Sequence, residues 1–213
     1  MGKRIGITGA ILAGGSSRRM GRDKAHLPWG STTLIAHVVE TLRPTMDELI
    51  VVVDDAGRFK SLGARVVEDR VPDAHALGGL FTALSCATST RCFVCACDSP
   101  FMNPPLVRFL CEQLDGVDLV IPRTDDGLQP LHAAYAPSAL PAIKAQLQQG
   151  HWNLRALVSK LHARVIEPEQ WRPFDRDGFS FWNLNTPADY AAAQQLTVTP
   201  SPAIGTRRAH ECW

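Results

Sequence analysis

The feature that most constrains this chain is the passage from an apolar run, Ile5 to Leu12, into a turn rich in glycine and positive charge. Glycines admit positive φ and let a backbone approach a ligand closely. Successive N–H groups in such a turn can hold an anion. The glycines and cationic side chains of the turn are Gly14, Gly15, Arg18, Arg19, Gly21, Arg22 and Lys24. This combination predicts a binding site for a polyphosphate at the end of a buried strand.

Two better-known phosphate loops do not match this turn. A Walker A loop requires G-x-x-x-x-G-K-[ST], whereas Gly21 is followed by Arg22 and Asp23. The dinucleotide fingerprint G-x-G-x-x-G is absent, and no helix pattern begins directly after the glycines. The alternative is a glycine–serine loop with solvated arginines, but the ordered run of strand, double glycine, arginines and lysine favours a phosphate-binding turn.

Strand-like and helix-like segments alternate along the rest of the chain. Apolar runs predict strands at 7–12, 49–53, 65–67, 91–97, 117–121 and 163–166, with an extra strand in 128–135 that is a candidate for antiparallel pairing. Periodic segments predict helices at 33–42 (with Ser31 or Thr32 as N-cap), 79–87, 104–114, 140–149, 154–161 and 187–196 (with Thr186 as cap). This alternation predicts an α/β domain with a mostly parallel sheet and helices on both faces. We expect the domain at 1–196 and a flexible tail at 197–213, where periodicity stops.

Composition excludes several classes of partner. With 213 residues the chain is long enough for one domain with a sizeable core. The net charge of +1 gives no indication of a nucleic-acid or membrane partner. No apolar run approaches the roughly 18–20 residues of a membrane span, and the short, glycine-interrupted start does not match a signal peptide. We therefore expect a cytoplasmic protein.

The cysteine-rich segment Cys92-Phe-Val-Cys95-Ala-Cys97 could suggest a metal site. Its apolar composition predicts a strand, however, on which Cys92 and Cys95 point to opposite faces. No second Cys/His pair with zinc spacing follows. We therefore expect these cysteines to be buried core residues.

Asp98 ends the fourth predicted strand, just before Pro100. Ligands of open parallel sheets bind at the carboxyl ends of the strands, so Asp98 should lie opposite the glycine turn. Mg²⁺ takes one or two carboxylates together with substrate phosphates. The alternative is an aspartate that caps the turn after the strand. Together with the glycine turn, the sequence favours Asp98 as a magnesium ligand.

Two of these segments resemble one known family. Leu12-Ala-Gly-Gly-Ser-Ser-Arg-Arg-Met-Gly-Arg-Asp-Lys24 resembles the signature loop of the molybdenum cofactor guanylyltransferases, and Cys97-Asp-Ser-Pro-Phe-Met-Asn-Pro-Pro105 resembles their C-D-x-P-[FY]-x-x-P motif. The resemblance implies a single Rossmann-like nucleotidyltransferase domain. It also implies that Asp98 binds the Mg²⁺ that accompanies the triphosphate, and that Arg18 and Lys24 neutralise charge during catalysis. The nucleotide-binding residues that it implies in these segments are Leu12, Ala13, Gly14, Gly15, Lys24 and Asp98.

Other matches to this family are weaker. Asp54 stands where the family typically has asparagine, and either reads guanine through its two oxygens or starts the turn before Ala56. Asp69 ends a V-x-D strand that contacts the nucleotide in the family. His75-Ala76 replaces the Gly-Pro of a G-P-L-A-G helix start, and Gly78 leaves helix N–H groups accessible there.

The C-terminal half carries two further matches on the acceptor side. Gln129-Pro-Leu-His132 resembles a Q-P-L-x-A-L-Y segment, and Phe181-Trp-Asn-Leu-Asn-Thr-Pro187 resembles the N-[VIL]-N-T-P motif. Asn183 and Asn185 share a face if the chain is extended there. They are candidates to bind the acceptor, whereas Thr186 is expected to cap the next helix.

The resemblance implies a transfer of GMP from GTP to the terminal phosphate of molybdopterin, with or without bound molybdenum. The alternatives are the same fold acting with CTP or another phosphorylated acceptor, and a non-catalytic nucleotide-binding module. Molybdoenzyme apoproteins or their chaperones are the expected protein partners. No Ser–His–Asp order stands out, and a direct displacement at phosphorus needs no protein nucleophile.

Overall fold

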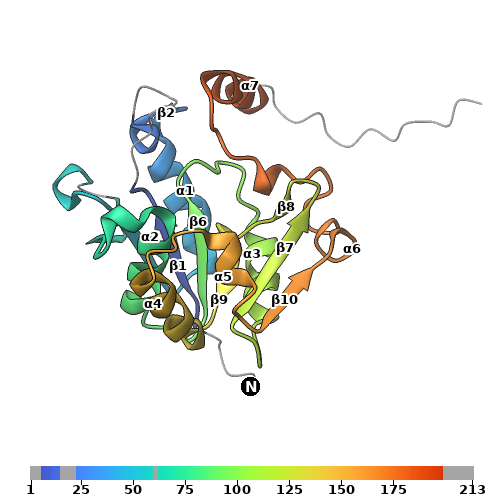
Figure 1. Cartoon of the computed structure of the whole chain (residues 1–213). Coiled ribbons are helices and arrows are strands. Elements are labelled where there is room, and N and C mark those ends of the chain that lie inside the picture. Colours follow the sequence, from blue (N-terminus) through green and yellow to red (C-terminus); the bar gives the residue numbers. More distant parts are fainter. Residues whose placement is uncertain (1–5, 15–22, 60–61, 199–213) are drawn as a thin grey trace, which may run out of the picture.

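The computed structural model describes residues 6–14, 23–59 and 62–198. One twisted sheet forms its centre (Figure 1). Its strands are β1 (Thr8–Leu12), β4 (Glu48–Val53), β5 (Arg65–Glu68), β6 (Cys92–Ala96), β7 (Leu119–Thr124), β8 (Gly127–Leu128), β9 (His132–Tyr135) and β10 (Ala163–Ile166). Their order is β10-β7-β9-β6-β1-β4-β5, and β8 pairs with β7. β1 runs parallel to β4 and β6, whereas β9 runs antiparallel to β6 and β7.

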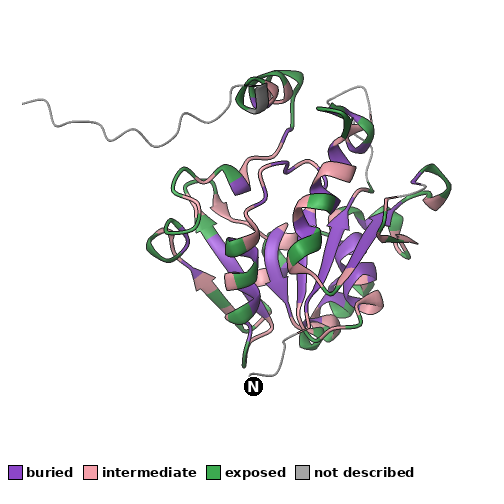
Figure 2. Ribbon diagram, turned by 180° about the vertical axis from the view of Figure 1, so that it is seen from behind, coloured by how far each residue is buried: buried purple, intermediate pink, exposed green. Residues whose placement is uncertain are grey.

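Helices cover both faces of this sheet (Figure 2). On one face lie α1 (Leu34–Leu42), α3 (Pro104–Glu112) and the short α6 (Pro168–Trp171). On the other lie α2 (His75–Cys86), α4 (Leu140–Gln148) and α5 (Leu154–Val158). The central strands β1, β4 and β6 are almost wholly buried, which explains why their sequences are apolar runs that do not alternate with polar residues.

Successive residues of each strand enter opposite cores. Along β1, Ile11 belongs to the core under α1 and α3, whereas Ala10 and Leu12 belong to the core under α2. The cysteines of β6 divide in the same way, with Cys92 on the α2 face and Cys95 on the other. The expected strand geometry of this segment is therefore confirmed.

A smaller third core joins an early segment of the chain to the described C-terminal segment. The hairpin β2 (Pro28–Trp29) and β3 (Thr32–Thr33) packs against the C-terminal helix α7 (Pro187–Val198). Leu184, fully buried, packs in this core with Trp29. The Tyr190 hydroxyl donates a hydrogen bond to the carbonyl of Pro28. This contact brings the segment before α7 next to the residues that follow the glycine turn (Figure 1).

The predicted α/β fold with a mostly parallel sheet and helices on both faces is confirmed, and the extra strand is antiparallel. Some boundaries differ. The N-cap of α1 is Thr33, whose hydroxyl accepts from the N–H of Ala36, and neither Ser31 nor Thr32 has this role. α2 begins at His75, because Gly78 and Gly79 are part of the helix and do not precede it. α7 includes residues 197 and 198, which the sequence assigned to the tail, and the remainder of that tail lies outside the described residues.

Candidate functional site

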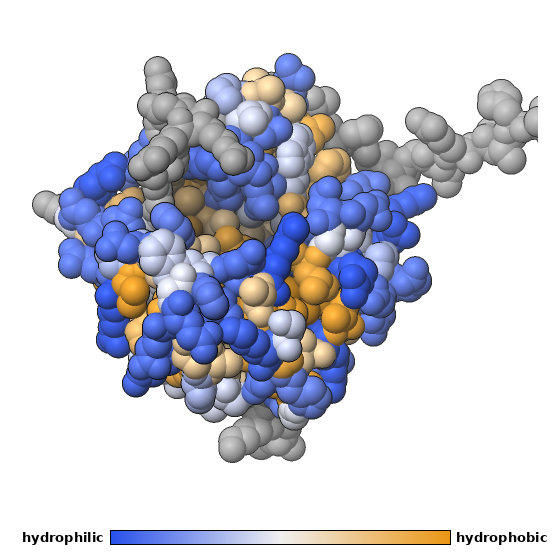
Figure 3. Space-filling model, in the orientation of Figure 1, coloured by the Kyte–Doolittle hydropathy of each residue, from blue (hydrophilic) through white to orange (hydrophobic). Residues whose placement is uncertain are grey.

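A large cavity opens at the carboxyl ends of the central strands, with a volume of about 1130 Å³. Its floor includes Leu12 at the end of β1, Ala13 and Gly14 after it, and Cys97 and Asp98 after β6. The space-filling view is hollowed at this edge of the sheet (Figure 3). Because these strands are parallel neighbours, residues far apart in sequence meet here, as ligand sites of such sheets require.

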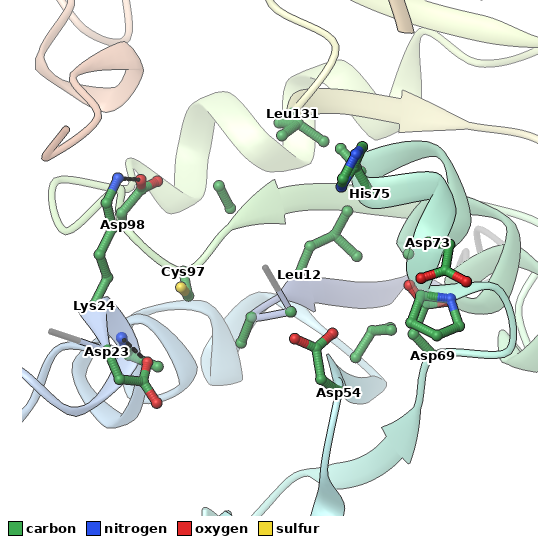
Figure 4. A pocket seen from close by; sticks show the side chains of 18 of the residues that line it. Leu12, Asp23, Lys24, Asp54, Asp69, Asp73, His75, Cys97, Asp98 and Leu131 are labelled. Atoms are coloured by element: carbon green, nitrogen blue, oxygen red, sulfur yellow. Dashed lines mark hydrogen bonds and ion pairs between the residues drawn. The ribbon is translucent and has the colours of Figure 1, made fainter. Parts of the chain in front are cut away.

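An ion pair between Lys24 and Asp98 occupies one end of this cavity (Figure 4). Lys24 Nζ lies 2.7 Å from Asp98 Oδ2, and the two side chains are only 16% and 13% exposed. Lys24 is held by a single helical turn, Lys24–His26, whose N-cap Asp23 accepts from the N–H of Ala25. The structure thus places both residues together, 74 positions apart in sequence.

The second oxygen of Asp98 has a different environment. Asp98 Oδ1 is buried and has no hydrogen-bond partner within the described part of the chain. The side chain therefore does not cap the turn after β6 there. A buried carboxylate oxygen without a donor is costly, and it is suited to a hard cation. Asp98 thus fits the magnesium ligand that the sequence predicts.

The C-terminal asparagines lie close to this pair. Asn185 Oδ1 accepts from Lys24 Nζ at 3.1 Å, and Asn183 Oδ1 accepts from the Ser99 hydroxyl at 2.5 Å. Between them, the N–H of Leu184 donates to the carbonyl of Asp98 at 2.9 Å. The hydroxyl of Thr186 accepts from the N–H of Asp189, so the predicted cap is present. The extended segment that contains Asn183 and Asn185 therefore runs alongside Asp98 and is hydrogen-bonded to it and to Lys24.

Asp54 lies across the floor from that end, beside Gly14. A Cβ added to Gly14 would lie 2.5 Å from Asp54 Oδ1, so only glycine permits this approach. The turn after β4 is capped by Asp55, whose carboxylate accepts from the N–H of Gly57. The N-cap of that turn is thus Asp55 and not Asp54. Asp54 lines the cavity.

Asp69 and Gly78 organise the start of α2. Asp69 Oδ1 accepts from the N–H of Val71 and from the hydroxyl of Thr82, which holds the loop to the helix. A Cβ on Gly78 would lie 2.0 Å from the Val71 carbonyl oxygen, so this glycine is required by backbone packing. Asp69 lines the cavity. Gly78 does not line it, although its neighbour Gly79 does.

The remaining predicted residues differ in whether they reach the cavity. Gly15 and Arg18 lie outside the described residues. In the Gln129–His132 segment only Leu131 lines the cavity, and His132 is buried. Among the charged and aromatic lining residues, Asp23, Asp73 and Trp152 are those that the sequence did not single out. Asp23 stands next to Lys24 in the signature loop, but no sequence signal marks Asp73 or Trp152.

The described lining is acidic. It contains five carboxylates and one ammonium, that of Lys24; the carboxylates are those of Asp23, Asp54, Asp69, Asp73 and Asp98. Asp23 is paired with Arg58 and His26. Within the described ranges no group of three or more His, Cys, Asp or Glu side chains could hold a metal alone. A cation here would therefore combine Asp98 with ligands from a bound substrate, as Mg²⁺ does at nucleotide sites.

The cysteines of the segment 92–97 are core residues. Cys92, Cys95 and Cys97 are all buried, and burial raises the pKa of each thiol far above its usual range. Neutral thiols on opposite sheet faces are core residues. The helices of the described residues include none that is long and apolar enough to cross a membrane.

Comparisons with known proteins agree with this geometry. The family model of the MobA-like NTP transferase domain matches residues 9–165. A probable molybdenum cofactor guanylyltransferase of Pelotomaculum thermopropionicum is 35% identical over 89% of this chain and 92% of its own length. Another from Chloroflexus aggregans is 36% identical over 91% and 96%. The crystal structure of molybdopterin-guanine dinucleotide biosynthesis protein A from Archaeoglobus fulgidus superposes with a TM-score of 0.79 at 28% identity, covering 89% and 98%.

Proposed function

The chain belongs to the MobA-like NTP transferase family, and from this premise we propose that it transfers GMP from GTP to the terminal phosphate of molybdopterin, with or without bound molybdenum. An oxygen of the acceptor phosphate forms a bond to the α-phosphorus of GTP. The bond from that phosphorus to the oxygen bridging to the β-phosphate breaks, and diphosphate leaves. The observation that carries the proposal is the Lys24–Asp98 pair at the strand ends, in a chain so similar to known guanylyltransferases.

Lys24 supplies positive charge to the reacting phosphates. Its ammonium has three donors, and within the described chain two of them are used by Asp98 and Asn185. The third is available to a phosphate oxygen, and the first two fix the direction in which it points. Such preorganised donors typically contribute about 10²–10³ in rate each. Arg18, on the glycine turn, is expected to add charge at the leaving diphosphate.

We propose Mg²⁺ as the cofactor, with Asp98 as its protein ligand. The buried, unpartnered Asp98 Oδ1 supports this assignment. The acidic lining supports it as well, because a polyanionic nucleotide is repelled by the carboxylates unless a cation accompanies it. When bound, the ion would withdraw charge from the phosphoryl oxygens.

Asp54 supports the choice of GTP. A carboxylate accepts two parallel hydrogen bonds, and guanine offers adjacent N1–H and N2–H donors. Cytosine offers an amino donor next to the N3 acceptor, which a carboxylate repels. Asp54 therefore favours guanine, and it does so at least as well as the asparagine usual in the family. Molybdoenzyme apoproteins or their chaperones are the partners that would receive the product.

The proposal is tested by diphosphate release from purified protein with molybdopterin and, in turn, GTP, CTP, ATP and UTP. We expect release with GTP and Mg²⁺, together with the guanine dinucleotide product. Removal of Mg²⁺ by a chelator should stop the reaction, and its re-addition should restore it. Turnover with CTP in preference to GTP would overturn the base assignment.

Variants test the roles of the charged pair. Asp98→Asn and Lys24→Ala should each lower kcat by about 10²-fold or more, because each removes a preorganised charge. The matched control is Glu112→Gln, which neutralises a half-exposed carboxylate on α3 outside the cavity lining. Near-normal rates for Asp98→Asn, with the fold intact by circular dichroism, would remove Asp98 as the metal ligand.

A further inference from the structure

Trp152 is an exposed aromatic residue that faces the cavity. The exposed large apolar side chains of the described residues are Trp152, Phe174, Phe179 and Leu196. Of these, Trp152 alone lines the cavity, and it does so with 44% of its surface exposed. Exposing an indole costs hydrophobic free energy unless a ligand covers it. The position of Trp152 at the cavity is therefore suited to a ligand with a flat ring.

The loop that carries Trp152 is built rigidly. It joins α4 to α5, and Gly150 adopts φ +68°, which turns the chain sharply. Gln146 Nε2 donates to the carbonyl of Asn153 at 2.9 Å, and the N–H of His151 donates to the carbonyl of Gln146. Asn153 in turn caps α5. The indole therefore projects from a fixed backbone.

His75 faces Trp152 from the start of α2. The two rings meet edge to face, with centroids 5.5 Å apart and planes at 81°. His75 has φ +52° and ψ −134°, and no other non-glycine described residue has positive φ. Side chains disfavour this conformation, and such residues cluster at ligand sites. The strained backbone directs the imidazole toward the cavity and against the indole, where together they form an aromatic wall.

The aromatic wall lies at the end of the cavity away from the Lys24–Asp98 pair. In Figure 4, Asp73 lies beyond Leu12 as seen from that pair, and His75 lies between Leu12 and Leu131; both line the cavity. Carboxylates repel phosphates but accept from N–H and hydroxyl groups. The end with Asp69 and Asp73 therefore suits the nucleoside, and the end with the Lys24 ammonium suits the phosphates.

We propose that Trp152, positioned by His75, packs against the purine ring of the bound nucleotide and favours purines over pyrimidines. The inference rests on the proposed function, since it assigns the base subsite of that same cavity. Aromatic side chains stack on nucleobases through their π faces, and the larger face of a purine buries more of the indole. Trp152 thus adds affinity and selects for the larger ring of a purine. Asp54 accepts the hydrogen-bond pattern that identifies guanine.

The test is isothermal titration of GTP and CTP with Mg²⁺, followed by steady-state kinetics. Trp152→Ala should weaken GTP binding by about ten-fold or more, as base stacking on aromatics predicts, and CTP binding by less. The KM for GTP should rise while kcat stays near the wild-type value. Trp152→Phe should keep most of the affinity. His75→Gly should weaken GTP binding through the misplaced indole, with no change in kcat.

Phe174→Ala is the matched control, because Phe174 is an exposed aromatic outside the cavity lining. Unchanged GTP affinity in Trp152→Ala would overturn the inference. A rise in the KM for the acceptor alone in Trp152→Ala would also overturn it, because the indole would then contact the acceptor and not the purine. If wild-type protein bound GTP but released no diphosphate, the proposed function would fail, whereas the binding comparison would still decide the role of Trp152.

Discussion

His132 gives the sharpest test of how burial controls this fold. It lies on β9 with only 3% of its surface exposed, and its ring packs edge-on against Phe93 and Phe181 at 5.1 and 4.8 Å. Neither ring nitrogen has a hydrogen-bond partner within the described residues. Burial lowers the pKa of His132 from 6.5 to about 3, so the folded protein keeps this imidazole neutral at any ordinary pH.

The sign and the size of the effect follow from proton linkage. Below pH 6.5 the unfolded chain takes up a proton at His132 and the folded protein does not, so unfolding becomes easier as the pH falls. Stability from this group is complete above about pH 6.5 and falls by about 1.4 kcal/mol per pH unit below it. Between pH 8 and pH 5 the free energy of unfolding should drop by about 2 kcal/mol through His132 alone.

The assay is urea unfolding of the wild type and of His132→Leu at pH 8 and pH 5. The leucine variant cannot take up the proton, so its stability should change by about 2 kcal/mol less over this range. The range avoids the titration of Glu48 and Asp118, because their hydrogen bonds already hold the pKa of each carboxyl below its usual value.

Two results would refute this reasoning. One is a parallel loss of stability in the wild type and in His132→Leu between pH 8 and pH 5. The other, independent of any variant, is an imidazole NMR shift of His132 in the folded protein that titrates near pH 6.5. Either would mean that the imidazole is not held neutral by its surroundings.

The other predictions concern the glycines and the strained histidine. Gly78→Ala should lower the free energy of unfolding by about 1–3 kcal/mol, because its Cβ would meet the Val71 carbonyl at 2.0 Å; an unchanged urea midpoint would contradict this. Gly14→Ala should leave stability nearly unchanged but raise the KM for GTP about ten-fold, because the added Cβ displaces the Asp54 carboxylate. The size follows from a charged hydrogen bond, which is worth roughly 1.5–3 kcal/mol. An unaltered KM would exclude Asp54 as a nucleotide contact. His75→Gly should raise the free energy of unfolding by about 1 kcal/mol, because relief of strain outweighs the added freedom of the unfolded chain; a loss of stability in urea would show that His75 is not strained.

The sequence predicts the long elements well because their physical signals are local. A strand such as β4 is buried on both faces, so it appears as an uninterrupted apolar run. The short elements have no such signal. The β2–β3 hairpin has two residues in each strand, and α6 has four residues, which is too few to show a period. The N-cap of α1 was misplaced because consecutive hydroxyl residues precede the helix, and only the backbone geometry selects Thr33.

The site is predictable to the extent that it follows from strand ends. Asp98 can be predicted because a carboxylate ends an apolar run and parallel strands end at one edge of the sheet. Trp152 could not be found in this way, since nothing in its neighbours indicates that the loop before α5 reaches the cavity. His75 is visible in the sequence as a departure from the family pattern, but nothing in the sequence predicts a positive φ at a histidine.

The contact between Lys24 and Asn185 links an early and a late segment of the chain at one end of the cavity. A partly buried ion pair such as Lys24–Asp98 gives little net stability, because desolvation offsets the attraction. Its value is positional, since Asn185 holds the ammonium from one side and the N–H of Leu184 holds the Asp98 carbonyl from the other. Leu184 is itself fixed in the third core, against Trp29. The packing of α7 against the β2–β3 hairpin therefore helps to set where the charged pair lies, although that packing is formed far from the pair in sequence.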